Sequence, residues 1–148
     1  MDRRILLVAN QTLAGDELTT TVNDRVAAGA TELWILVPAK TLNDPLGPAA
    51  AAAGVARVSP ERSGVEVAEA RLRDALYRFD RLGIPVGGEV SDQHPIDAIS
   101  AVLSRRPFEE VIISTLPTRI SHWLRIDLPS QVQRKFAIPV TTITAQGR

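Results

Sequence analysis

The order of apolar runs along the chain constrains its fold more than any other feature of the sequence. Residues 4–10 (RILLVAN), 32–38 (ELWILVP) and 109–114 (EEVIIS) are continuous apolar runs of strand length, as strands buried on both faces of a sheet are. Segments with helical periodicity separate these runs, and strands joined by helices form parallel sheets with right-handed crossovers. The sequence therefore predicts an α/β domain with helices on both faces of a parallel sheet.

Four segments carry apolar residues at the spacing of one helix face. Gly29 and Gly83 follow the first two segments and suit helix ends, and Pro95 suits the first turn of the third. Strands and helices together indicate a single domain over residues 1–148, without an internal repeat or a linker. The apolar faces consist of Leu18, Val22 and Val26; of Val65, Ala68, Leu72, Ala75, Leu76 and Phe79; of Ile99, Val102 and Leu103; and of Leu128, Val132 and Phe136.

Two weaker strands are predicted at residues 84–90 (IPVGGEV) and 138–144 (IPVTTIT). The proline and paired glycines of the first suit a sheet edge better than a sheet centre. With the weaker strands at the edges, the expected strand order is 3-2-1-4-5, and this order reverses between strands one and four. Ligands of such sheets bind at the carboxyl ends of the strands, beside this switch point.

Residues 39–63 are expected to form one long loop, because prolines, glycines and an alanine run dominate the segment. A short helical turn at 49–53 fits the alanines. Loops of this length in a compact domain are usually functional or mobile. A disordered surface excursion explains the composition equally well, so both interpretations stay open.

Charge and composition exclude several classes of function. Lysine and arginine number 17, and aspartate and glutamate also number 17, so no net field attracts nucleic acid or a membrane surface. The absence of cysteine rules out disulfides and thiolate metal sites and fits a reducing compartment. The sequence shows neither a signal peptide nor a run of about 20 apolar residues. We expect a cytoplasmic protein that contacts neither nucleic acid nor membrane.

The switch point predicts where a ligand would bind. The segments after strands one and four, 9–15 (ANQTLAG) and 114–119 (STLPTR), carry amide, hydroxyl and guanidinium groups. A guanidinium can clamp an anion and an indole can stack on a base, but the same side chains can instead pair with acids or pack at an interface. The candidate ligand-binding residues are Asn10, Thr12, Val37, Ser114, Thr115, Arg119 and Trp123.

Neither catalysis nor metal binding is indicated. Ser114, a histidine and Asp127 could be combined as a triad, but no G-x-S-x-G turn presents the serine. The two histidines, His94 and His122, lack the spacing of metal ligands. Trp34 lies in a buried run and is expected in the core. We therefore predict no catalytic residue, no metal and no cofactor.

In the order of its elements, almost the whole chain resembles the universal stress protein family. Residues 94–114 are similar to the family's proline-led helix and the strand after it, and residues 132–143 to its closing helix and strand. The stretch from 114 to 129, STLP…WLR.DLP, is similar to that of actinobacterial members. The resemblance implies a five-stranded sheet of order 3-2-1-4-5. It also implies a homodimer paired through the last strand, at Ile138, Val140 and Thr142.

Nucleotide-binding members of that family carry the pattern G-x2-G-x9-G-[ST] after strand four, where glycines let the backbone approach phosphates. This chain has no glycine between Gly88 and Gly147, and the last Gly-Ser pair of the pattern falls on Ile126 and Asp127. Asp127 is expected to cap its own helix and to occupy the place of a phosphate. Residues 10–12 also lack the aspartate that such members often carry after strand one. Family-type ATP binding is therefore not expected.

Two functions follow from these observations. The leading hypothesis is a non-catalytic, universal-stress-protein-like domain with a stress-response or regulatory role, which acts through protein contacts as a homodimer. The alternative is a module that binds a nucleotide or another small anion in a divergent pocket at the carboxyl ends of strands 1, 2 and 4.

Overall fold

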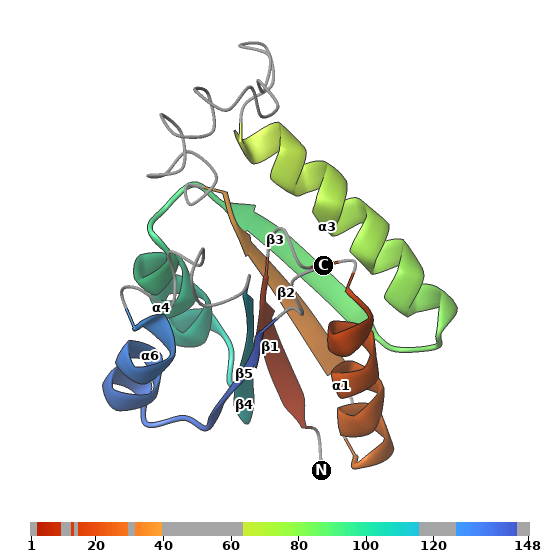
Figure 1. Ribbon diagram of the computed structural model, residues 1–148. Helices are drawn as coiled ribbons and strands as arrows, with labels where there is room; N and C mark the ends of the chain where they lie inside the picture. Colours follow the sequence, from red (N-terminus) through yellow and green to blue (C-terminus); the bar gives the residue numbers. More distant parts are fainter. Residues whose placement is uncertain are drawn as a thin grey trace.

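The strands form one five-stranded parallel sheet in the order β3-β2-β1-β4-β5, which confirms the predicted order (Figure 1). The computed structural model describes residues 3–9, 13, 15–29, 32–39, 64–115 and 127–144, so the loop expected at 39–63 lies outside the described residues except for Ala39. The elements are β1 (Arg4–Val8), α1 (Asp16–Ala27), β2 (Glu32–Pro38), α3 (Gly64–Arg81), β3 (Val86–Ser91), α4 (Pro95–Arg105), β4 (Glu110–Thr115), α6 (Leu128–Phe136) and β5 (Val140–Thr144).

The sheet has two faces, and each is covered by a pair of helices. Side chains along a strand point alternately to the two faces. Figure 1 shows α1 and α3 on one face of the sheet and α4 and α6 on the other. Ile5 and Leu7 of β1 belong to the core of the α1 and α3 face, whereas Leu6 and Val8 belong to the core of the α4 and α6 face. All four side chains are buried. Burial on both faces explains why the sequence of this strand is apolar without interruption.

The helices begin and end close to the positions that the sequence predicts. Gly29 and Gly83, which follow α1 and α3, have φ angles of 114° and 80°, a region that glycine enters without strain. Pro95 opens α4, where the backbone needs no N–H donor. Val26 departs from the prediction, because its side chain is 37% exposed while Leu18 and Val22 of the same helix are buried.

The paired glycines of β3 allow a close approach of neighbouring groups. A Cβ atom at Gly88 would lie 2.6 Å from the carbonyl oxygen of Ile35 and 2.7 Å from Cδ1 of Leu72. A Cβ atom at Gly87 would lie 2.6 Å from Cζ3 of Trp34, its register partner on β2. The glycines were expected as a mark of a sheet edge, and β3 is an edge strand. The contacts add a second reason for glycine at both positions.

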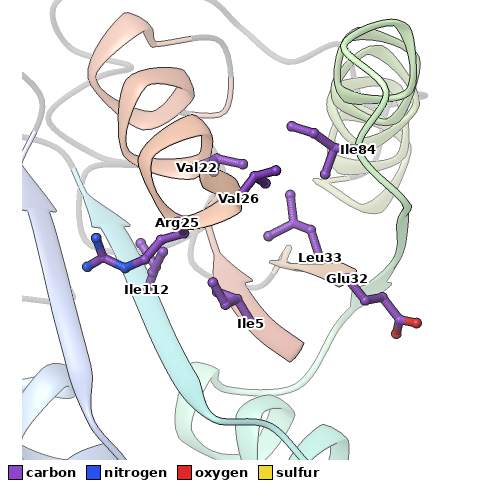
Figure 2. Close-up of a pocket in the computed structure, with 8 residues that line it drawn as sticks. All are labelled: Ile5, Val22, Arg25, Val26, Glu32, Leu33, Ile84 and Ile112. Atoms are coloured by element: carbon purple, nitrogen blue, oxygen red, sulfur yellow. The ribbon is translucent and has the colours of Figure 1, made fainter. Parts of the chain in front are cut away.

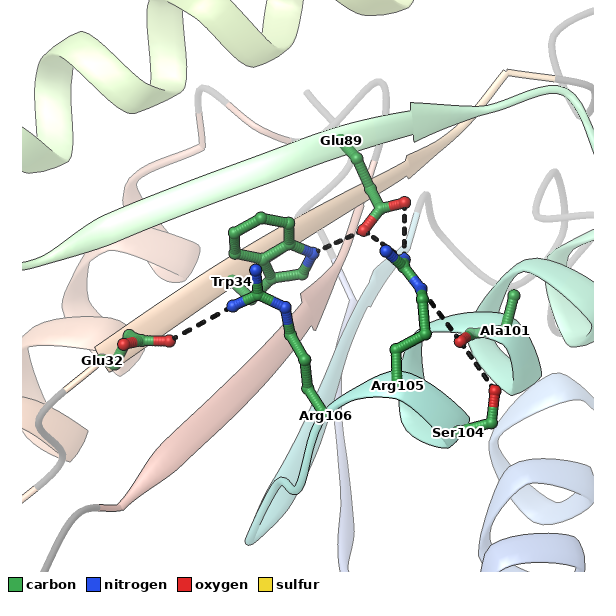
Figure 3. A network of polar contacts seen from close by, with 7 residues as sticks. All are labelled: Glu32, Trp34, Glu89, Ala101, Ser104, Arg105 and Arg106. Atoms are coloured by element: carbon green, nitrogen blue, oxygen red, sulfur yellow. Dashed lines mark hydrogen bonds and ion pairs between the residues drawn. The ribbon is translucent and has the colours of Figure 1, made fainter.

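Trp34 was expected in the core, and the structure places it at the border of the core of the α4 and α6 face, packed against it but only partly buried. Its Nε1 donates a hydrogen bond of 2.9 Å to Glu89, and the guanidinium of Arg106 lies 3.9 Å from its ring centroid (Figure 3). Charged side chains therefore border the indole on the side away from the core.

Two clusters of charged side chains complete the cover of the sheet at opposite corners. Helix α3 packs on β2 and β3 from one face, and on the other face of these strands Glu32, Trp34, Glu89, Arg105 and Arg106 form what we term the β3-corner network. Helix α6 packs on β5 from one face of the sheet. On the opposite face of β4 and β5, Arg25, Glu110 and Thr141 form the β5-corner network. In both networks an arginine near a helix end forms hydrogen bonds with a strand glutamate.

Candidate functional site

The switch point of the sheet lies between β1 and β4, as expected. Val8 is the register partner of both Leu36 and Ile113, so the next residues, Val37 and Ser114, flank the end of β1 on its two sides. Both side chains are buried, at 0% and 2% exposure, and the alternation of side chains directs them to the α1 and α3 face. Thr115, at 3% exposure, points to the opposite face. The structure therefore brings Val37 and Ser114 to one face and separates Thr115 from them.

The other candidate residues lie outside the described residues. These are Asn10, Thr12, Arg119 and Trp123.

Ala39, which follows β2, is buried, and its N–H donates a hydrogen bond of 2.7 Å to the carbonyl of Ser91 at the end of β3. This hydrogen bond joins the carboxyl end of β2, which carries Val37, to the carboxyl end of β3.

Asp127 does not cap the helix that follows it, so the expected cap is wrong. Its backbone is in the left-handed region, with φ 55° and ψ 45°, and its side chain makes no capping hydrogen bond. A capping residue normally has an extended backbone, which brings its side chain back to the N–H groups of the second and third helical residues. Here Pro129 also lacks one of these two N–H groups. The carbonyl of Asp127 accepts a hydrogen bond of 3.1 Å from the N–H of Gln131.

Arg78 is a residue near the site that the sequence did not indicate. It lies on α3, and its Nη2 donates a hydrogen bond to the carbonyl oxygen of Leu13, in the segment that joins β1 to α1. The side chain of Leu13 is 3% exposed and belongs to the core of the α1 and α3 face. No local pattern marks such a contact, because 65 residues separate the two partners.

The electrostatics of the β5-corner network favour an ionised glutamate. Arg25 donates to the carboxylate of Glu110 over 2.8 and 3.0 Å, and the hydroxyl of Thr141 donates to it over 2.5 Å. Burial raises the pKa of Glu110, but these hydrogen bonds and the charges of Arg25 and Arg3 outweigh burial and hold the pKa below its ordinary value. The hydrogen bond to Glu110 also raises the pKa of Arg25. The network is a fixed structural ion pair rather than an acid–base pair near neutral pH.

An apolar hollow lies at the amino ends of the strands, away from the switch point (Figure 2). It has a volume of about 240 Å³, part of which is open to solvent. Figure 2 shows the guanidinium of Arg25 and the carboxylate of Glu32 turned away from it, so the walls offer no polar group to orient a ligand. The lining residues are Ile5, Val22, Arg25, Val26, Glu32, Leu33, Ile84 and Ile112.

No group of three or more histidine, aspartate or glutamate side chains in the described ranges is placed to hold a metal ion. None of the described helices has the length and apolar character that crossing a bilayer requires.

The fold is that of universal stress proteins. A universal stress protein from Archaeoglobus fulgidus is 15% identical, with a TM-score of 0.61 over 97% of this chain and 94% of that chain. A universal stress protein family protein from Arabidopsis thaliana with AMP bound is 11% identical, with a TM-score of 0.64 over 98% and 93%. A third, from Burkholderia pseudomallei, is 16% identical, with a TM-score of 0.56 over 94% of each chain. No protein-family model and no curated protein matches the sequence. The resemblance predicted from the sequence is confirmed in the fold.

Proposed function

We propose that this chain, which has the universal stress protein fold, is a non-catalytic stress-response or regulatory domain that acts through protein contacts as a homodimer. The observation that carries the proposal is the position of β5 at one edge of the sheet. An edge strand presents N–H and C=O groups without a partner and is a template for pairing with another chain. Ile138 and Val140 are partly buried beside the core, so a partner strand at this edge would extend a surface that is already apolar.

The direction of the backbone groups of β5 identifies a residue that tests the dimer. The N–H of Val111 on β4 donates to the carbonyl of Pro139, and Val111 is the register partner of Val140. In a parallel ladder with this register, the N–H groups of Thr141 and Ile143 face β4, and that of Thr142 faces outward. Proline at 142 therefore removes an outward donor and leaves the ladder to β4 intact.

We expect the native chain to be a dimer at micromolar concentration by light scattering coupled to size exclusion, and Thr142→Pro to be a monomer. Thr142→Val is the matched control, because it alters the side chain and keeps the N–H, and we expect it to remain a dimer. A native chain that is monomeric at this concentration would contradict the proposal.

We also propose that the domain does not bind ATP in the manner of the glycine-containing members of the family. The support is chemical. The chain lacks the glycines after β4, and the carboxylate of Asp127 stands at the start of α6, where it repels a phosphate. Glycine lets a phosphate come close to the backbone, and the side chain of Asp127 obstructs that approach.

A second candidate function is the binding of a nucleotide or another small anion in a divergent pocket. It is favoured by the AMP bound to the Arabidopsis protein of the same fold, and by the placement of Val37 and Ser114 beside the switch point. Calorimetric titration with ATP, AMP and cyclic AMP separates this candidate from the first. Heat of binding from AMP alone would support a divergent pocket, and no heat from any of the three would reject the nucleotide.

If an anion is bound, we expect Arg119→Ala to weaken its affinity by roughly tenfold, because a charged hydrogen bond to the ligand is lost. Arg73→Ala is the control, since Arg73 is exposed on α3. Equal affinity in the native chain and in Arg119→Ala would remove Arg119 from the site.

A further inference from the structure

The backbone groups on the outer edge of β5 are arranged symmetrically along the strand. The register with β4 turns the N–H and C=O groups of Thr141 and Ile143 toward β4. The groups of the alternate residues Val140, Thr142 and Thr144 therefore face outward. Thr142 is the middle one of the three, so a second copy of β5 that runs in the opposite direction presents its donors and acceptors at matching positions.

The side chains of β5 favour strand pairing at this edge. The strand is Val-Thr-Thr-Ile-Thr, without a charge, a proline or a glycine. Charges, prolines and bulges are the usual means by which an edge strand avoids pairing with another chain. At the other edge of the sheet, β3 carries Glu89 and two glycines. The residues of β5 are all β-branched, a type that suits a strand with neighbours on both sides.

On the α1 face of β5, the β5-corner network prepares Thr141 for burial. Its hydroxyl donates to Glu110 over 2.5 Å and accepts a hydrogen bond of 3.2 Å from Arg25. A hydroxyl that makes both kinds of hydrogen bond can be covered by an apolar group without the cost of an unsatisfied polar atom. Ile143, the next side chain on this face, packs against the core but is only partly buried. This face of the edge thus holds an apolar side chain next to a threonine that can be covered.

We propose that two copies of this chain pair through β5 in the antiparallel register that places Thr142 on the two-fold axis. A two-fold axis that joins the same edge of both copies into one sheet makes the paired strands antiparallel. In this register Thr142 pairs with its own copy, and Val140 pairs with Thr144 of the second copy. The inference rests on the proposed homodimer and deepens it, because it assigns which residues meet.

This register satisfies both the backbone and the side chains of the edge. All three outward residues gain a partner within β5, whereas a shift of the axis by one residue leaves Val140 or Thr144 opposite a residue beyond the strand. On the α1 face, Ile143 lies directly opposite Thr141 of the second copy, whose hydroxyl is already bound by the β5-corner network. The network then supports the interface, because it leaves no hydroxyl to be desolvated without a partner.

The experiment oxidises single-cysteine variants of the full chain at micromolar concentration with copper phenanthroline and follows covalent dimers by non-reducing electrophoresis. The native sequence contains no cysteine, so each variant carries one thiol. Opposite residues of a hydrogen-bonded antiparallel pair have Cα atoms about 5.5 Å apart, within the range of a disulfide. We expect Thr142→Cys to form the dimer roughly tenfold faster than Thr20→Cys, because pairing raises the effective concentration of the two thiols. Thr20 is exposed on α1, so its variant measures random collisions.

Two further measurements test the register itself. Thr144→Cys is the matched control on the same strand, and we expect it to react at the rate of Thr20→Cys, because Thr144 lies opposite Val140 and not opposite its own copy. A mixture of Thr141→Cys and Ile143→Cys is expected to give the mixed dimer in preference to either homodimer, since these two positions face each other with Cα atoms about 4.5 Å apart.

The outcomes separate the register from the homodimer. If the native chain is a dimer by light scattering but Thr142→Cys reacts no faster than Thr20→Cys, the register is wrong and the homodimer stands. Fastest reaction at Thr144→Cys, or homodimers in preference to the mixed dimer, would also overturn the register. A monomeric native chain would overturn the homodimer and the register together.

Discussion

At position 88 the space for a single methyl group is already occupied. The carbonyl oxygen of Ile35 and Cδ1 of Leu72 both approach the position where a Cβ atom would stand, and the first of these is backbone of the adjacent strand. At position 87 the obstacle is the ring of Trp34, which is a side chain but is held by Glu89 and Arg106. Backbone can move less easily than a side chain, so the two glycines differ in what they tolerate.

We predict that Gly88→Ala lowers the free energy of unfolding by about 2 kcal/mol, because overpacking of this kind displaces β3 from β2. Gly87→Ala is expected to cost less, since the indole can shift toward solvent. Urea denaturation of the two variants and the native chain measures both values. Equal loss in the two variants, or a gain in Gly88→Ala, would show that the contact at 88 relaxes freely.

Individual residues are also where the sequence misleads. Asp127 has the residue type of a helix cap, but its left-handed backbone and Pro129 leave the carboxylate without its usual donors. Trp34 has the residue type of a core side chain, but it is only partly buried and its indole contacts Glu89 and Arg106. Arg78 has the residue type of a solvated helix position, yet it donates to a carbonyl 65 residues away. The errors at Trp34 and Arg78 arise because distant parts of the chain decide the environment of the residue, whereas the error at Asp127 arises from its own backbone and from Pro129.

At the scale of elements, the β3-corner and β5-corner networks connect helices to the edge regions of the sheet through charged side chains. Each contains an arginine near a helix end that is paired with a strand glutamate, and Figure 3 shows this pairing between Arg105 and Glu89 at the β3 corner. The β5-corner network is the more buried of the two, with side-chain exposures of 31% for Arg25 and 17% for Glu110. It fastens α1 to both β4 and β5.

This arrangement predicts a pH dependence. The pKa of Glu110 is lower in the folded protein than its ordinary value of 4.5, so ionised Glu110 stabilises the fold above that pH. The stabilisation is lost as the pH falls through the folded pKa. We expect Glu110→Gln to lower the free energy of unfolding at neutral pH by about 1 kcal/mol, allowing for partial exposure of the pair.

The measurement is chemical denaturation of the native chain and the variant at neutral pH and at a pH well below 4.5. The difference between them is expected to shrink toward zero in acid. Glu109→Gln is the control, because Glu109 is the exposed neighbour and its replacement is expected to leave both values unchanged. A difference that persists at low pH would mean that packing, and not the charge of Glu110, stabilises the corner.

At the scale of the whole molecule, the sequence was sufficient for the architecture. Apolar runs and helical periodicity are local, and they identify every described strand and helix within about two residues of its ends. The strand order followed from one further argument, that the two weakest strands lie at the edges. The site was less accessible to the same reasoning, because its geometry depends on which strand ends meet and on which face each side chain points. Val37 and Ser114 meet at the switch point, whereas Thr115 faces the opposite side.

A two-fold dimer through β5 would join two such sheets into one of ten strands, with the β3 edges at its ends. The networks at the β5 corners would then lie beside the interface, and those at the β3 corners would lie at the far ends. Pairing at β5 would not involve β1, which lies between β2 and β4. The proposed dimer and a ligand at the switch point would therefore be compatible in the same molecule.

The contact between Leu13 and Arg78 also bears on the order in which the chain folds. Leu13 comes early in the sequence, but its carbonyl gains its donor only from a helix that begins about fifty residues later and is docked on β2 and β3. Contacts between distant residues form late, because the intervening chain must first be closed into a loop. The pairing of β1 with β4 joins residues still farther apart in the sequence, such as Ile5 and Glu110, so both the centre of the sheet and the contact of Leu13 must wait until the middle of the chain has been closed into a loop.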